Sequence, residues 1–189
     1  MSLLILGLIL FLGVHSVSIV APRWRDAMHA RLGEGPWKGL YSLVSIAGFA
    51  LLVVGYGVAR EHPVVLYAPP TWLRHVAMLL LLPVFPLLLA AYLPGRIKSA
   101  AKHPMLLAVK LWATAHLLAN GSAADVLLFG GFLLWAVADR ISMKHRVQRP
   151  LPGPAPSPRN DVIAVVAGLA IYVLFVLWGH LWLIGVAPV

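Results

Sequence analysis

The chain contains no cysteine among its 189 residues, and only 6 of them are acidic. The absence of cysteine excludes disulfides, thiolate nucleophiles and cysteine-held zinc or iron–sulfur sites, and it leaves histidine as the strong nitrogen ligand for any metal. Charged residues of both signs make up 11% of the sequence, against about a quarter in soluble domains. This composition excludes an ordinary soluble protein.

Hydrophobic residues are abundant instead, at 61% of the chain with a mean hydropathy of +0.89. A helix needs about 20 apolar residues to cross a bilayer, so the length allows roughly six spans with short loops. We therefore expect an all-α membrane protein, a bundle of about six transmembrane helices that forms a single domain over residues 1–189. The expected spans cover residues 3–21, 37–59, 71–92, about 104–119, 123–139 and 162–185.

Proline and glycine predict how these spans bend, pack and connect. Pro83 and Pro86 fall inside the third expected span, where a missing backbone hydrogen bond favours a kink. Asn120-Gly121-Ser122 forms a tight turn that predicts an antiparallel hairpin of the fourth and fifth spans. Small residues let helices approach closely. They lie inside the second span at Gly48, Gly55 and Gly57.

The remaining connections are also distinctive. Residues 22–36 predict a short interfacial helix closed by Gly33 and Gly35. The proline-rich residues 149–158 predict an extended linker. Asn160-Asp161 is expected to cap the last span, since both side chains accept hydrogen bonds from helix N-termini.

The net charge of +9 would suggest a nucleic-acid partner if the basic residues were gathered on one soluble face. They lie in loops beside hydrophobic runs, which indicates membrane orientation, so no nucleic acid is expected. The loops after the first, third and fifth spans are the basic ones, and the alternate side holds only Arg60 and Arg74. By the positive-inside rule the basic loops are cytoplasmic, and both termini are non-cytoplasmic in a multi-pass protein.

Two histidines lie deep within expected spans. His15 is about seven residues, roughly 10 Å, from the cytoplasmic end of its helix, and His116 is about twelve residues, roughly 18 Å, beyond Pro104. Two imidazoles projecting from neighbouring helices commonly hold haem b. We therefore expect His15 and His116 to be metal ligands that face one pocket lined by Gly13, Ser16 and Ala113. The simpler interpretation is a hydrogen bond across helices, which contributes about 0.6 kcal/mol.

Other basic residues are secondary candidates for cofactor binding. His180, flanked by Trp178 and Trp182, is either an alternative partner of His116 or an interfacial anchor. His103 is a candidate for binding a carboxylate or phosphate, or belongs to a plain basic interface. Lys110 either pairs with a haem propionate or extends its amino group toward the membrane surface.

Three segments together resemble the NnrU family of bacterial membrane proteins, over essentially the whole chain. They are Phe11-x3-His15, His103-Pro104-x7-Trp112-x3-His116-x4-Gly121 and His180-x4-Gly185-Val186-x-Pro188. The resemblance implies a protein of the bacterial inner membrane, associated with denitrification and with nitrite or nitric oxide reductase components as partners. The family is similar to the plant 15-cis-zeta-carotene isomerases, which use haem b, and this implies that His15 and His116 match the histidines proposed there as haem ligands.

The start of the fourth span also resembles the Arg-His-Pro segment of isoprenylcysteine methyltransferases and sterol reductases. Here the segment reads Lys102-His103-Pro104, with lysine in place of arginine and Met105 after the proline. Those enzymes have a polar C-terminal cofactor region, whereas this chain ends in an apolar segment. These differences disfavour a methyltransferase or an NADPH reductase.

Three functions are therefore compatible with the sequence. The first is a haem b membrane protein that serves nitrite or nitric oxide reduction as a redox or accessory component. The second is a haem-dependent cis/trans isomerase of a polyene lipid. The third is a cofactor-free accessory protein whose histidines only pack the bundle.

Overall fold

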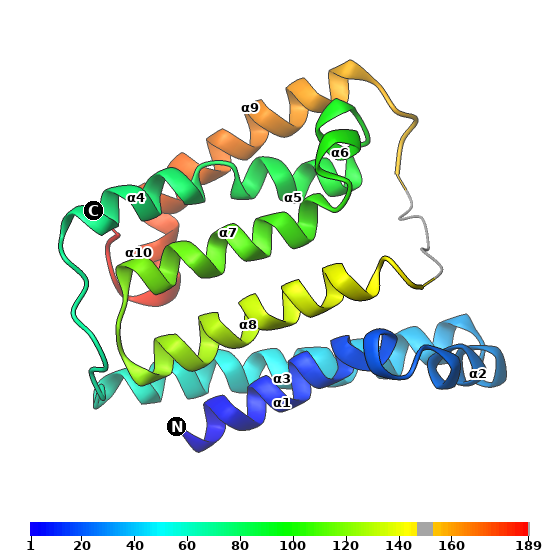
Figure 1. Ribbon diagram of the computed structural model, residues 1–189, viewed down its shortest axis with the longest axis horizontal. Coiled ribbons are helices and arrows are strands. Elements are labelled where there is room, and N and C mark those ends of the chain that lie inside the picture. The colour runs from blue at the N-terminus through cyan, green and yellow to red at the C-terminus, as the bar shows by residue number, and fades with distance from the viewer. Residues whose placement is uncertain (147–152, 189) are drawn as a thin grey trace. The chain divides into compact units, whose positions relative to one another are not determined.

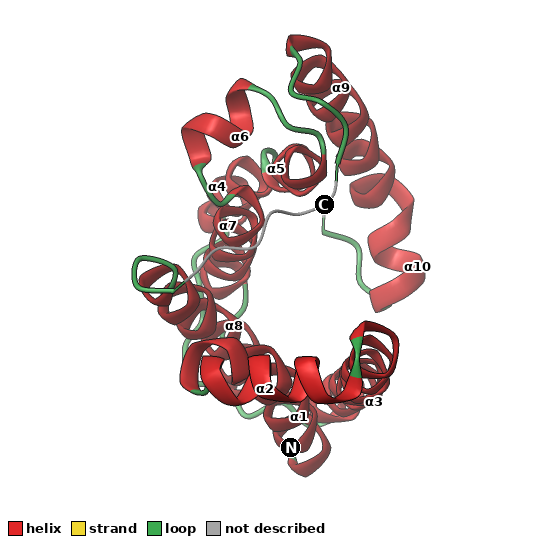
Figure 2. Cartoon of the chain, turned by 90° about the vertical axis from the view of Figure 1, so that its right-hand side faces the viewer, coloured by secondary structure: helices red, strands yellow, loops and turns green. Residues whose placement is uncertain are grey.

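The computed structural model describes residues 1–146 and 153–188, and helices dominate this part of the chain (Figure 1; Figure 2). The elements in chain order are α1 Ser2–Val20, α2 Pro22–Leu32, α3 Glu34–Glu61, α4 Trp72–Leu81, α5 Val84–Tyr92, α6 Arg96–Ala101, α7 Pro104–Ala119, α8 Ala123–Ser142, α9 Pro158–Leu174, the π-helix η1 Phe175–Gly179, and α10 His180–Ile184. The all-α prediction is confirmed, since the described residues form no β-strand. The predicted linker at 149–158 lies partly outside the described residues.

Within residues 1–146 and 153–188, four helical stretches are long and apolar enough to cross a membrane. They are Ser2–Val20, Glu34–Glu61, Trp72–Tyr92 and Pro158–Ile184. The 16 residues of α7 span only about 24 Å, less than the ~30 Å hydrocarbon core. The 20 residues of α8 are long enough but include Asp125, Asp139 and Arg140. The helices therefore support a membrane protein with four clear spans, and the count of about six remains a prediction.

The described residues form two compact units. The first contains residues 1–68 and 121–146, with α1, α2, α3 and α8. The second contains residues 69–120 and 153–188, with α4 to α7 and the C-terminal helices. The predicted hairpin of the fourth and fifth spans remains a prediction, because its helices α7 and α8 belong to different units.

In the first unit, α1 and α3 pack backbone against backbone through glycines. A Cβ atom added at Gly48 would lie 2.7 Å from the backbone nitrogen of Phe11, and one at Gly7 would lie 2.6 Å from that of Leu52. Gly55 meets the backbone of Leu4 in the same way. The residue numbers rise along α1 as they fall along α3, so the two helices are antiparallel. The predicted close packing is confirmed for Gly48 and Gly55, whereas Gly57 faces open space.

A helix after the first span is present as α2, and its position at the membrane interface stays a prediction. Helix α2 begins at Pro22, and it ends before Gly33, which has a φ of +83° that glycine adopts without steric strain. Gly35, which was predicted to close this helix together with Gly33, lies inside α3 instead.

In the second unit, the predicted interruption of the third span lies between α4 and α5, where Pro83 precedes the first residue of α5. Gly168 of α9 packs directly against Pro86, which brings α5 and α9 into close contact.

The predicted cap of the last span is wrong. Helix α9 begins at Pro158 with Ser157 as its N-cap, because proline suits the first turn of a helix. Asp161 therefore lies inside α9, and its carboxylate instead accepts hydrogen bonds from the backbone nitrogens of Arg96 (2.8 Å) and Ile97 (3.0 Å) at the start of α6. The predicted capping residue stabilises a different helix.

The last helical stretch changes its winding before the chain ends. After α9, the five residues of η1 form a π-helix, and α10 follows at once. Gly185 then adopts a left-handed conformation with a φ of +77° and ends α10. The turn is closed by a 2.6 Å hydrogen bond between Nδ1 of His180 and the carbonyl oxygen of Val186.

Candidate functional site

His15 is held in one orientation by its own helix. Its Nδ1 lies 2.6 Å from the carbonyl oxygen of Phe11, one turn earlier, and the two rings stack with centroids 4.3 Å apart. The rings of Tyr41 and Trp135 approach the imidazole at 5.2 and 6.0 Å. A carbonyl oxygen can only accept, so Nδ1 carries the proton and the lone pair of the neutral ring is on Nε2.

His116 repeats this arrangement on α7. Its Nδ1 lies 2.8 Å from the carbonyl oxygen of Trp112, again four residues earlier, and the ring centroids are 5.3 Å apart. Histidines that bind a metal commonly donate their other N–H group to a backbone carbonyl, which fixes the tautomer and orients the ring. The two histidines selected from the sequence thus share the tautomer that suits coordination through Nε2.

The structure places these two residues in different units, His15 in the first and His116 in the second. The prediction that they face one pocket therefore stays a prediction. Among residues 1–146 and 153–188 no group of three or more His, Cys, Asp or Glu side chains could hold a metal ion. A two-histidine haem site needs no such group, since the porphyrin supplies the other ligands.

The secondary candidates have identifiable structural positions. The Nδ1 atom of His180 binds the C-terminal turn, which explains the spacing His180-x4-Gly185-Val186 without a cofactor. His103 is the N-cap residue of α7 and its side chain makes no capping hydrogen bond. Lys110 lies half-buried on α7. Nothing in these positions selects either His103 or Lys110 as a cofactor ligand.

Asp125 is a buried acidic residue that the sequence analysis did not select. Its carboxylate accepts hydrogen bonds from the backbone nitrogen (2.8 Å) and hydroxyl (2.7 Å) of Ser122 and from the hydroxyl of Tyr56 (2.6 Å). The local pattern Ser-x-x-Asp at a helix start is a capping box, and this signal was available in the sequence. The role of Asp125 is to start α8 and to join it to α3.

Near the end of α8, three buried donors lack an acceptor. They are Nε1 of Trp135, Oγ of Ser142 and Nη1 of Arg146, and no described residue accepts from them. Arg146 uses its other terminal nitrogen in a 2.7 Å ion pair with the buried Asp139. A buried donor left without a partner costs about 1–3 kcal/mol, so water or ligand oxygens are expected beside these atoms. The carboxylates of haem b are acceptors of the required kind, and Trp135 is also the residue beside His15.

These features define an integral membrane protein of the all-helical class, in which His15 and His116 each contact the carbonyl oxygen of an aromatic residue one helical turn earlier. The family model described as NnrU protein matches residues 3–188, through both units. The chain belongs to the NnrU family. No curated protein and no solved structure matched the chain in the corresponding comparisons.

Proposed function

We propose that this protein binds haem b through His15 and His116 and acts in denitrification as a redox or accessory component of nitrite or nitric oxide reduction. The observation that carries the proposal is the shared arrangement of the two histidines. Each donates Nδ1–H to the carbonyl of an aromatic residue four positions earlier, which leaves Nε2 as the basic nitrogen. Membership of the NnrU family supports the proposed pathway.

The residues of the chain would position the cofactor rather than perform chemistry on a substrate. Haem b, when bound, supplies an iron that exchanges a single electron. The carbonyl groups of Phe11 and Trp112 would hold the imidazole rings in the orientation and tautomer that suit coordination through Nε2. The buried donors near the end of α8 can bind carboxylate oxygens.

The absorption spectrum of the purified protein tests the proposal. We expect the sharp bands of a haem with two histidine ligands in the native protein. His116→Ala and His15→Ala should each abolish this spectrum, because each variant removes one of the two histidines that would hold the haem. His145→Ala is the matched control, since His145 lies in the exposed turn after α8, and its spectrum should be native. A native spectrum in the His116 variant would transfer the ligand role to another histidine, with His180 as the next candidate.

The spectrum also separates the two alternatives. A protein purified without haem, and unable to take it up from added hemin, would support a cofactor-free accessory protein. An isomerase of a polyene lipid would share the haem spectrum, so it requires a second assay. Conversion of a cis-polyene by the reduced protein, lost in His15→Ala, would favour the isomerase over the denitrification role.

A further inference from the structure

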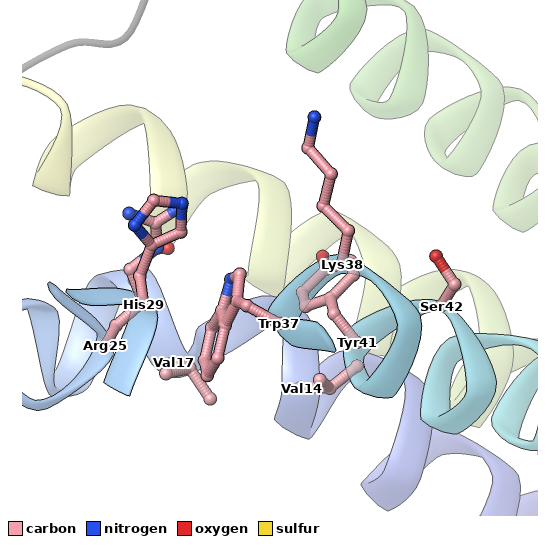
Figure 3. A pocket seen from close by; sticks show the side chains of 9 residues that line it. Val14, Val17, Arg25, His29, Trp37, Lys38, Tyr41 and Ser42 are labelled. Atoms are coloured by element: carbon pink, nitrogen blue, oxygen red, sulfur yellow. The ribbon is translucent and has the colours of Figure 1, made fainter. Parts of the chain in front are cut away.

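A pocket with a volume of about 270 Å³ lies among α1, α2 and α3, entirely within the first unit (Figure 3). Its lining includes three basic side chains, those of Arg25, His29 and Lys38. Three hydroxyl groups accompany them, from Ser18, Tyr41 and Ser42, and no acidic side chain lines the pocket. The pocket therefore offers positive charge and hydrogen-bond donors to a ligand, which is the chemistry that recognises an anion.

Helical spacing explains why these groups gather. Arg25 and His29 are four residues apart on α2, and Lys38 and Ser42 are four residues apart on α3, so each pair shares one face of its helix. In Figure 3 the side chains of Lys38 and Ser42 extend to the same side of α3. The indole of Trp37 forms an apolar wall between the helices, and the guanidinium carbon of Arg25 lies 5.8 Å from the centroid of that ring.

Two acidic residues compete for the cations but do not fill the pocket. Asp26 pairs with Nη1 of Arg25 at 3.0 Å, and this bond uses one of the five N–H donors of a guanidinium. Glu34 pairs with Lys38 at 2.6 Å, but both side chains are about 70% exposed, at 69% and 70%. Such an exposed pair contributes little to stability, so an incoming anion can recruit the lysine.

We propose that this pocket binds a phosphate group, and that the source of the phosphate is the headgroup of an anionic membrane phospholipid. A planar guanidinium matches the oxygens of a phosphate, and lysine adds a point charge. The volume of this pocket is smaller than the ~300–1,000 Å³ of pockets that bind drug-sized ligands. A pocket of this size suits a lipid headgroup. One side of the pocket is apolar and is formed by Val14 and Val17, which belong to the membrane-spanning helix α1. The basic loop here is the predicted cytoplasmic one, where anionic lipids are concentrated.

Native mass spectrometry of the detergent-purified protein tests this site with three separate probes: phosphatidylglycerol, phosphatidylcholine and inorganic phosphate. We expect one tightly retained phosphatidylglycerol per chain and much weaker retention of phosphatidylcholine. Each cation near a membrane surface changes affinity about fivefold. The double variant Arg25→Gln/Lys38→Gln should therefore bind phosphatidylglycerol roughly 25-fold more weakly.

The control removes the same number of positive charges, both from α2. Arg23 and Arg31 are exposed and do not line the pocket, so Arg23→Gln/Arg31→Gln should retain the lipid as the native protein does. Equal losses in the two double variants would overturn the proposal, because they would indicate attraction to the general surface charge. Equal retention of phosphatidylcholine and phosphatidylglycerol would overturn it as well.

Inorganic phosphate decides the source of the ligand. If it displaces the lipid at millimolar concentration, and does so only when Arg25 and Lys38 are present, the phosphate site stands and the lipid assignment is overturned. Circular dichroism of each variant checks that it is folded. If the double variant does not fold, the single variant Lys38→Gln provides the same test, because this side chain is 70% exposed. Its affinity for phosphatidylglycerol should fall about fivefold. None of these results depends on haem.

Discussion

Replacing Gly48 by alanine tests the closest part of the α1–α3 contact. The new Cβ atom would lie 2.7 Å from the backbone nitrogen and 3.0 Å from the Cα atom of Phe11. Both are backbone atoms of a helix, so no flexible side chain can move aside and the helices must separate. Overpacking of this kind costs about 1–3 kcal/mol, whereas alanine favours a helix over glycine by up to about 1 kcal/mol.

Gly57→Ala on the same helix isolates the steric contribution. A Cβ atom at Gly57 would have no neighbouring atom within 4 Å. This variant therefore gains the higher helix propensity of alanine without a steric clash. We therefore expect the free energy of unfolding of the Gly48 variant to lie about 1–3 kcal/mol below that of the Gly57 variant. Unfolding by sodium dodecyl sulfate in mixed micelles, followed by circular dichroism, measures both values. Equal stabilities would refute the close approach of the two backbones.

The Gly48 contact has a second readout. The carbonyl oxygen of Phe11 holds Nδ1 of His15 and the Phe11 ring stacks on the imidazole. If haem binds at His15 as proposed, displacing Phe11 should therefore shift its absorption bands. The loss of stability follows from the glycine geometry alone, so it is expected whether or not haem is bound.

Two further predictions concern the connections between helices. Asp161→Ala should lower the free energy of unfolding by about 1 kcal/mol, because the first turn of α6 loses its acceptor. Asp161→Asn, which keeps one acceptor oxygen, should lose less in the same detergent titration, and equal losses would show that charge rather than hydrogen bonding matters. Reporter fusions at the C-terminus and within residues 149–159 should report opposite sides of the membrane, and matching signals would refute the predicted orientation.

The sequence predicted the helices well because hydrophobic runs, prolines and glycines act locally. The break between α4 and α5 occurs where Pro83 and Pro86 indicated it, and the helix α2 occupies most of the predicted interfacial segment. The function of Asp161 could not be predicted in the same way. Its partners Arg96 and Ile97 lie 65 and 64 residues earlier in the chain, and a single sequence gives no information on such a contact.

In the candidate site, too, contacts between residues close in sequence could be predicted, and contacts between distant residues could not. The spacing of four residues between Phe11 and His15, and between Trp112 and His116, is visible in the sequence and determines the observed hydrogen bonds. The bond between Tyr56 and Asp125 joins positions 69 residues apart and was not predicted. The pocket among α1, α2 and α3 was also not predicted, although Arg25 and His29 have the spacing of one helix face.

The π-helix at Phe175–Gly179 affects how the last helix can change its length. A π turn contains one residue more than an α turn, so it absorbs an insertion without breaking the helix. Deleting one residue there would restore α winding, and the residues beyond it would keep their face of the helix, because the wider π turn is what accommodates the extra residue. His180 would keep its contact with the carbonyl oxygen of Val186, because both residues lie beyond the π-helix and move together. At this point of the chain, the helix can therefore change its length by one residue and still present the same face at its C-terminal end.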